Sequence, residues 1–332
     1  MSIDIHAHIV SEALVGELAG QLPEIAPRVE GAGRDRFFVY PSGRRSGPIV
    51  PGMFDLGSRL ADMDQQGVGM QALSVPPTHF FYDLAPDRAA VAAVLHNDDM
   101  VATARSRPDR FVVLATLPLQ APDAAVAEIE RLVPEPLVVG VELATNVAGR
   151  NLDDPALSEV WGALARAGMP VVLHPDNPMG GSRIEKYFLH NLVGLPTDTT
   201  LAAACLMFGG VLESHPGLRV GLVHGGGFLP YQIGRLVHGW KVRREPKVHL
   251  QVSPADLLER FWFDTVTHDP LSLQFLLERV GPDRLCLGSD YPFDMADPDP
   301  AGSVRRVIGD QALRDRVLEA TPRRFLTRLP QA

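Results

Sequence analysis

Residues 3–8 read Ile3-Asp4-Ile5-His6-Ala7-His8, an apolar run that ends in two histidines separated by one residue. Alternate side chains of an extended strand leave by the same face, so both imidazoles can reach a single metal ion. A His-x-His triplet also occurs by chance, and it then more often lies on a surface than binds anything. The triplet therefore predicts a strand, and it predicts a metal site only if further ligands converge on it.

Three later segments repeat this pattern of an apolar, strand-like run that stops at a metal-capable residue beside glycine or proline. They are the runs 171–175, 220–225 and 285–290, which carry His174, His224 and Asp290. Each histidine taken singly could be a satisfied core residue. Matches at four strand ends argue against chance, and they indicate that the strands converge on one site.

Strand-like and helix-like runs alternate along the chain, which favours βα units and a parallel sheet. The predicted strands are 3–8, 70–75, 111–116, 138–143, 170–174, 220–224, 261–265 and 285–290. The predicted helices are 58–66, 86–106, 122–132, 155–167, 197–213, 271–280 and 311–320. This order predicts an α/β fold, a (β/α)8 TIM barrel, whose active site lies at the carboxyl ends of the strands. The candidate ligands lie at that end of their runs.

Composition narrows the class of protein. The 332 residues, 45% of them hydrophobic, suffice for one large domain, so we expect residues 1–332 to form a single barrel domain. A net charge of −9 opposes a general attraction to nucleic acid, and no uncharged stretch reaches membrane-spanning length. Cys205 and Cys286 resemble buried small hydrophobes and not a disulfide framework. We expect a cytoplasmic protein without a nucleic-acid or membrane partner.

Two long segments interrupt the alternation of strands and helices. Residues 9–54 follow the first strand, and we predict that this insertion forms a lid or small subdomain over the barrel mouth. Residues 176–196 follow the strand that ends at His174, a position that suggests substrate contact. Phe188 in this loop and Phe293 after the last strand are candidates for lining the pocket, although aromatic residues near loops are more often simply packed.

Together these motifs resemble the amidohydrolase superfamily, and within it the aminocarboxymuconate-semialdehyde decarboxylases and their relatives. The resemblance rests on residues 3–8, 174–175, 224–227 and 288–293, with support from 63–68, 116–122 and 268–273. It covers nearly the whole chain. It implies a metal-dependent barrel, commonly with zinc and usually a homodimer, in a family where non-oxidative decarboxylases stand beside hydrolases and hydratases.

Carried over position by position, the resemblance implies that His6, His8, His174 and Asp290 hold the metal. Three imidazoles and one carboxylate suit Zn²⁺, and ligand type leaves Mn²⁺ or another divalent ion open. His224 is then a general acid/base and not a ligand. Asp290 has a catalytic role as well, because it would receive a proton in a hydrolytic reaction.

The resemblance also suggests how a substrate carboxylate is bound. Arg235 matches an arginine that in the family reaches into the neighbouring subunit's site, and a guanidinium can hold a carboxylate through two hydrogen bonds. A second family arginine aligns near Gly47, with Arg44 and Arg45 a few residues upstream. The family's His-Pro-Trp-Asp is here His-Pro-Asp-Asn at 174–177. These departures leave open which arginine serves the pocket, and they leave the substrate open too.

The sequence therefore predicts a metal-dependent carbon–carbon lyase that removes carboxylate from a small unsaturated or aromatic acid. A hydrolase of a lactone or amide is the alternative, because the ligand set alone does not decide between the two reactions. A metal-binding module without enzymatic activity is the third class, and it would have no need of His224 beside the ligands.

Overall fold

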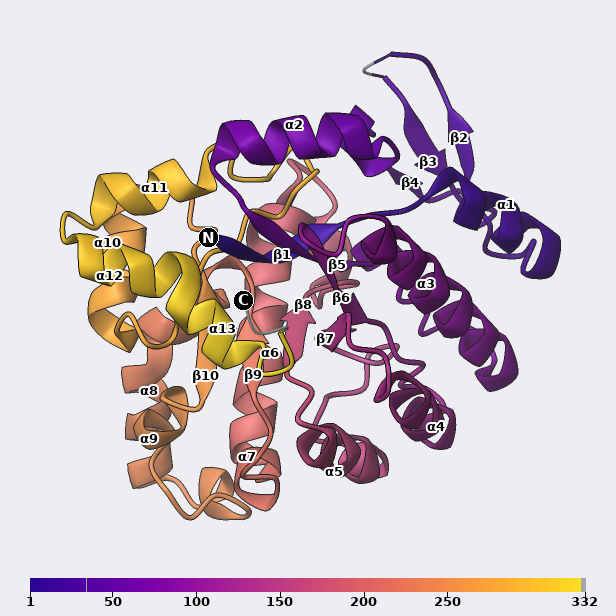
Figure 1. The fold of residues 1–332 in the computed structure, drawn as a ribbon. Helices are drawn as coiled ribbons and strands as arrows, with labels where there is room; N and C mark the ends of the chain where they lie inside the picture. Colours follow the sequence, from indigo (N-terminus) through magenta and orange to yellow (C-terminus); the bar gives the residue numbers. More distant parts are fainter. Residues whose placement is uncertain (34, 330–332) are drawn as a thin grey trace.

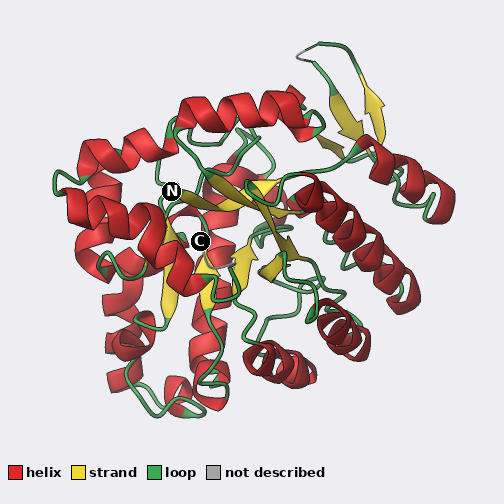
Figure 2. Ribbon diagram, in the orientation of Figure 1, coloured by secondary structure: helices red, strands yellow, loops and turns green. Residues whose placement is uncertain are grey.

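The computed structural model describes residues 1–33 and 35–329 and has a ring of strands enclosed by helices (Figures 1 and 2). Within these residues, one sheet holds eight parallel strands in the order β1-β5-β6-β7-β8-β9-β10-β11. Their bounds are β1 Ile3–His8, β5 Met70–Ser74, β6 Phe111–Ala115, β7 Val138–Ala144, β8 Val171–His174, β9 Val220–Leu222, β10 Phe261–Asp264 and β11 Leu285–Cys286. The predicted α/β class and (β/α)8 barrel are confirmed.

Backbone hydrogen bonds join the segment after β11 to β1 and close the ring. The amide of Ile5 donates to the carbonyl of Leu287 at 3.0 Å, and the amide of Asp290 donates to the carbonyl of His6 at 2.9 Å. The strands β9 and β11 end before the predicted residues 224 and 290. His224 and Asp290 have φ angles of 55° and 61°, and a left-handed residue cannot continue a strand.

Helices cover the outside of the ring (Figure 2). Their bounds are α2 Leu56–Gln66, α3 Pro86–Ser106, α4 Pro122–Leu132, α5 Ser158–Ala167, α6 Leu195–Phe208, α7 Val211–Ser214, α8 Leu229–Val242, α9 Pro254–Leu258, α10 Pro270–Val280, α11 Pro300–Val307, α12 Gln311–Asp315 and α13 Thr321–Phe325. The helices α8, α9, α11 and α13 are not among the predicted ones. Three of them, α9, α11 and α13, have eight residues or fewer and so show little periodicity. No helix in the described part of the chain has the length and hydropathy needed to cross a membrane.

The interior of the barrel is apolar below the strand ends. Ile3, Ile5, Val172 and other strand residues pack there with Phe325 from α13, which is fully buried. A Cβ atom on Gly221 would lie only 2.8 Å from the ring of Phe325, so a larger residue at 221 would displace the ring. The C-terminal helix therefore fills the end of the barrel opposite the predicted site.

In the segment predicted as an insertion, α1 (Glu12–Gln21) and a three-stranded antiparallel sheet of β2 (Arg28–Glu30), β3 (Phe37–Val39) and β4 (Arg45–Ser46) project at one side of the ring (Figure 1). This segment has its own apolar cluster, whose members include Leu14, Leu18, Phe38 and Met53. Residue 34 of the predicted insertion and residues 330–332 of the predicted domain lie outside the described residues. The action of the insertion as a lid stays a prediction.

Replacing Phe325 with Ala should lower the free energy of unfolding by about 3–5 kcal/mol, because it empties a site enclosed by strand residues. Denaturant unfolding measures this change. Val248→Ala is the control, since Val248 is 65% exposed and its loss should change stability by no more than about 0.5 kcal/mol. Equal effects of the two substitutions would show that α13 does not fill the barrel.

Candidate metal centre

The predicted site residues meet at the carboxyl end of the barrel. His6 and His8 lie at the end of β1, His174 ends β8, and His224 and Asp290 follow β9 and β11. All are buried except His224, whose side chain is 17% exposed. The alternation of β1 therefore presents both of its imidazoles to the inside of the barrel.

Asp290 is the centre of this group. Its Oδ1 atom lies 3.3 Å from Nε2 of His6, 3.2 Å from Nε2 of His8 and 4.0 Å from Nε2 of His174. Its other oxygen, Oδ2, lies 3.5 Å from Nε2 of His224. Oδ1 thus faces three of the imidazoles, and Oδ2 faces the fourth, which belongs to His224.

Hydrogen bonds on the far side of each ring fix the tautomer of the three imidazoles near Oδ1. Nδ1 of His8 donates to the carbonyl of Val75 at 2.8 Å, and Nδ1 of His174 donates to the carbonyl of Pro175 at 3.0 Å. A carbonyl can only accept, so in both neutral rings the lone pair is on Nε2. His6 makes the equivalent bond through Nδ1 to Asp264.

These atoms fit a divalent metal ion. Nε2 of His6, His8 and His174 and Oδ1 of Asp290 are buried, and none has a hydrogen-bond partner within the described residues. Buried polar atoms are normally paired, so four orphaned acceptors around one point indicate that a cation completes the site. Three imidazoles with one carboxylate suit Zn²⁺ and other borderline divalent ions.

Distance alone does not exclude His224 as a ligand. His6, His174, His224 and Asp290 each place one donor atom within 4.8 Å of the others. The nearest approach of His224, however, is to Oδ2 and not to the oxygen that the other imidazoles face. Its Nδ1 is buried without a partner among the described residues, so its tautomer is not fixed. This arrangement suits a residue that exchanges protons, and that role stays a prediction.

At Asp290 and His174, the surroundings favour the protonation state that binds a metal ion. Burial would raise the pKa of Asp290, but the nearby imidazoles of His6, His224 and His8 hold it well below its usual value. Burial, reinforced by the neighbouring imidazoles, holds the pKa of His174 well below that of an ordinary histidine. His6 differs: burial lowers its pKa, but Asp290 and Asp264 raise it well above the ordinary value. A metal ion would therefore compete with a proton at His6.

The three glycines after His224 serve close packing. Gly226 and Gly227 have φ angles of 77° and 60°, and a Cβ atom on them would lie 2.5 Å from Phe263 and 2.2 Å from the carbonyl oxygen of Pro196. No other residue type fits such positions without displacing its neighbours. The glycines thus let the backbone at His224 approach the barrel.

Two buried aspartates that sequence reasoning did not assign a role support the site. Asp264 on β10 accepts from Nδ1 of His6 at 2.7 Å and from the amide of Gly225 at 2.7 Å. Asp4 accepts from the amide of His6 at 3.0 Å and from the hydroxyl of Ser289 at 2.6 Å, and burial raises its pKa to about 6. A lone acidic residue within an apolar strand is the signal that could have found both.

Glu142 on β7 is also a lone acidic residue within an apolar strand, and sequence reasoning assigned it no role. It is fully buried, neither carboxylate oxygen has a hydrogen-bond partner in the described residues, and one oxygen lies 3.8 Å from Nδ1 of His8. Burial raises its pKa, which favours the neutral acid.

A cavity of about 710 Å³ opens over these residues. Both predicted aromatic contacts line it, and the ring of Phe293 lies 5.1 Å from that of His8. Phe188 lines it from the loop after β8 and is 46% exposed. Arg44 and Arg45 of the insertion reach the same cavity. The insertion therefore contributes to the wall of the pocket.

The structure separates the three candidate arginines. Nη2 of Arg44 lies 2.8 Å from Oδ1 of Asp176, whereas the guanidinium of Arg45 lies 4.6 Å from the ring centroid of Phe37. Arg235 lies on the exposed part of α8 and is not among the residues that line the cavity. Within one chain, Arg235 does not meet the other predicted site residues.

Comparison with known proteins places this geometry in context. A family model described as amidohydrolase matches residues 3–328. The 2-amino-3-carboxymuconate-6-semialdehyde decarboxylase of Dictyostelium discoideum is 33% identical, over 76% of this chain and 71% of the relative. Gamma-resorcylate decarboxylase of Rhizobium radiobacter is 29% identical, over 79% of this chain and 88% of the relative. The predicted resemblance is confirmed, and both relatives are named as decarboxylases.

A solved structure agrees in fold. The 5-carboxyvanillate decarboxylase of Novosphingobium aromaticivorans, with bound manganese, superposes with a TM-score of 0.82 at 19% identity. The match covers 98% of this chain and 97% of the other. At this identity the likeness establishes the barrel alone.

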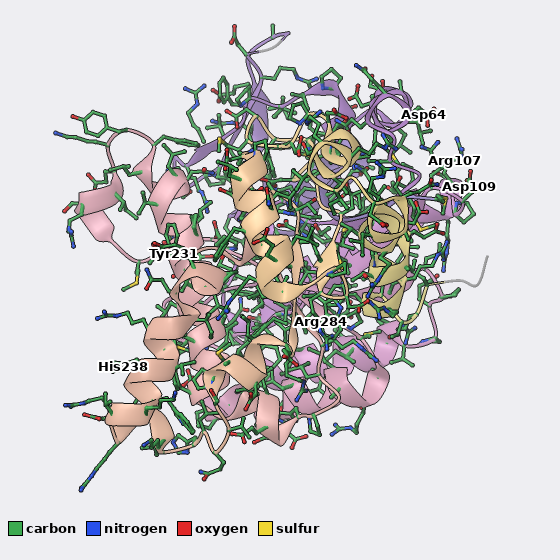
Figure 3. All side chains as sticks on the ribbon, turned by 90° about the vertical axis from the view of Figure 1, so that its left-hand side faces the viewer. Asp64, Arg107, Asp109, Tyr231, His238 and Arg284 are labelled. Carbon is green, nitrogen blue, oxygen red and sulfur yellow. The ribbon has the colours of Figure 1, made fainter. Side chains whose placement is uncertain are left out.

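Replacing Asp264 with Asn should weaken zinc binding about 10- to 100-fold, because the hydrogen bond that orients His6 loses its charged acceptor. Competition with a chromogenic chelator measures the affinity. Asp109→Asn is the control, since Asp109 is exposed and lies far from α8 on the opposite flank (Figure 3). Unchanged zinc affinity in Asp264→Asn would remove Asp264 from the support of the site.

Proposed function

Because the chain belongs to the amidohydrolase family, we propose that it is a metal-dependent non-oxidative decarboxylase of a small unsaturated or aromatic carboxylic acid. The observation that carries the proposal is the set of three imidazole Nε2 atoms and one carboxylate, buried under a cavity large enough for a small acid. The decarboxylase names of the two relatives support the choice of reaction.

His6, His8, His174 and Asp290 would hold the ion, and we propose Zn²⁺, with Mn²⁺ as the alternative that the manganese-bound structural neighbour suggests. When bound, a divalent ion supplies Lewis-acid polarisation and a charge that orients an anionic substrate. The ligand nitrogens contribute no charge of their own, and the carboxylate of Asp290 cancels one of the two positive charges, so a net positive charge remains available to the substrate.

His224 is proposed to move the proton. In its protonated form it donates a proton to the carbon that bears the carboxylate, which interrupts the conjugation of the substrate. The carbon–carbon bond then breaks, its electron pair restores the conjugated system, and carbon dioxide leaves. His224 regains its proton from water. Histidine suits this step because it gains and loses a proton near neutral pH.

Arg44 is the better candidate for a carboxylate anchor within the same chain. Its pairing with Asp176 uses one of its nitrogens and holds the guanidinium at the cavity, which leaves other N–H groups for a ligand. Arg45 instead stacks on Phe37. Phe188 and Phe293 would form the flat walls against which an unsaturated or aromatic acid packs.

A homodimer is proposed through the surface beside α8. Tyr231 and Leu271 are 76% and 75% exposed, and Phe275 is 42% exposed beside them. An apolar surface of this kind marks an interaction site. Tyr231 and His238 lie along the outer flank of α8 (Figure 3), and Arg235 shares their face because it is four residues from Tyr231. Dimerisation there would carry Arg235 toward the partner's site.

A cytoplasmic location is also proposed. Cys205 and Cys286 are both unpaired, and a reducing compartment keeps thiols in this form. The net charge of −9 supports the absence of a nucleic-acid partner.

Zinc-loaded protein given freshly generated aminocarboxymuconate semialdehyde should release carbon dioxide, and a chelator-treated sample should not. His224→Ala should keep its metal content but lose about 10²- to 10⁴-fold in rate, because the proton donor is gone. His249→Ala is the control, because His249 is exposed and does not line the cavity. Incorporation of ¹⁸O from solvent water into the product, without carbon dioxide, would instead establish the hydrolase.

Mixing two inactive variants tests the dimer. If Arg235 acts in the partner's site, His224→Ala and Arg235→Ala should complement each other, since each mixed dimer has one site with both residues intact. Random reassortment should then restore about a quarter of the sites. Activity is measured after joint refolding. If Arg235→Ala alone retains full kcat and KM, Arg235 has no role in binding the substrate.

A further inference from the structure

A chain of buried hydrogen bonds runs from α3 to the wall of the cavity. Nδ1 of His96 lies 2.7 Å from the carbonyl oxygen of Ala92, and Nε2 of His96 lies 2.9 Å from Nδ1 of His79. Nε2 of His79 lies 2.8 Å from the hydroxyl of Tyr40, which lies 2.8 Å from the hydroxyl of Thr78. The two histidines are 1% exposed and Tyr40 is 6% exposed.

The chain has one direction when both imidazoles are neutral. The carbonyl of Ala92 can only accept, so the single hydrogen of His96 is on Nδ1 and its Nε2 accepts. His79 must then donate through Nδ1, which leaves its own Nε2 to accept from the hydroxyl of Tyr40. Tyr40 has no second hydrogen, so its oxygen accepts from Thr78. The carbonyl of Ala92 therefore sets the position of every hydrogen in this chain of hydrogen bonds.

Burial keeps the imidazoles neutral. It lowers the pKa of His96 to about 4, and with His96 and Arg44 nearby it holds the pKa of His79 well below the ordinary value. Within the described residues, no carboxylate is hydrogen-bonded to either ring. A proton added to one of them would be a buried charge without a counter-ion.

Thr78 is where this chain meets the candidate site. Thr78 lines the 710 Å³ cavity together with His174, His224 and Asp290, and it also lines an adjoining cavity of about 400 Å³ with Tyr40. Because its hydrogen is directed to Tyr40, only the lone pairs of its oxygen remain for a ligand. Asp176, which lines both cavities, adds a second acceptor to this wall.

We propose that Thr78 is a hydrogen-bond acceptor of fixed polarity in the substrate pocket, and that it selects acids that carry an O–H or N–H donor over acids that carry an ether there. The inference rests on the proposed function, because it narrows the substrate class of the same site. Thr78 contacts the substrate, whereas Tyr40, His79 and His96 are positioning residues that act through it.

A hydroxyl that can rotate accepts from a donor or donates to an acceptor with little preference. The fixed chain prevents Thr78 from donating. The ether oxygen of a ligand would therefore face the hydroxyl oxygen of Thr78 with no hydrogen between the two. An unpaired buried polar contact of this kind weakens binding by about tenfold relative to a paired one. Selectivity thus comes from the residues behind Thr78 as much as from Thr78 itself.

Binding of matched benzoates to the zinc-loaded protein, measured by calorimetry, tests the proposal. The probes are 3- and 4-hydroxybenzoate, the corresponding aminobenzoates and the corresponding methoxybenzoates. In at least one position, the hydroxy and amino acids should bind about tenfold more tightly than the methoxy acid. Thr78→Val should bring this ratio close to one, and Thr78→Ser should keep it.

Tyr40→Phe separates a positioning role from a merely structural one. Without the acceptor at Tyr40, the hydroxyl of Thr78 can turn and donate, so methoxybenzoate should gain affinity relative to hydroxybenzoate. General damage would weaken both acids alike and leave the ratio unchanged. Tyr82→Phe is the matched control, because it removes a buried hydroxyl of the neighbouring wall that lies outside the chain.

The outcomes keep this inference distinct from the proposed function. Binding needs no turnover, so a ratio that depends on Thr78 and Tyr40 supports the inference even if no acid releases carbon dioxide. An equal ratio in the wild type, Thr78→Val and Tyr40→Phe overturns it while leaving decarboxylation intact. Failure of every benzoate to bind the zinc-loaded protein also overturns it, because the cavity then does not accept acids of this class.

Discussion

The buried carboxylate of Asp290 is the constraint on which the rest of the site depends. Its Oδ1 atom faces imidazole nitrogens of His6 and His8 at 3.3 and 3.2 Å, but the Nδ1 of His8 already carries that ring's hydrogen to a backbone carbonyl. Opposed lone pairs around a buried charge are unfavourable unless a cation or proton lies between them. The pKa of His6 is raised for the same reason, because a proton on His6 can supply the positive charge that the carboxylate needs. A divalent ion satisfies every atom at once.

The residues that support the metal centre and the residues that line the substrate cavity come from different parts of the fold. Asp4 and Asp264 lie on strands, where backbone pairing on both sides fixes their positions to the benefit of His6. The wall of the cavity comes from the insertion and the loop after β8, where Arg44 and Asp176 meet. These two residues occupy the regions where the sequence departs from the family pattern. Their ion pair brings these two regions together in space.

Much of the barrel could be predicted from the sequence because strands covered on both faces read as continuous apolar runs. The ends of β9 and β11 could not, since the left-handed backbone at His224 and Asp290 depends on contacts with other strands. Glu142 and Asp264 escaped notice for a related reason. A single acid in an apolar strand has no pattern of its own, and only the assembled barrel reveals what it faces.

The sequence by itself determined the succession of strands and helices, the histidines and Asp290 at the strand ends, and the resemblance to a family, because each is a local pattern of residue types. The tertiary structure decided which atoms meet. It directed the free nitrogen of His174 toward Asp290, and it connected Tyr40 of the insertion to Thr78 after β5 through a single hydrogen. Such pairings join residues far apart in the chain, and hydrogen bonds depend on ångström-scale geometry that no spacing along the sequence encodes.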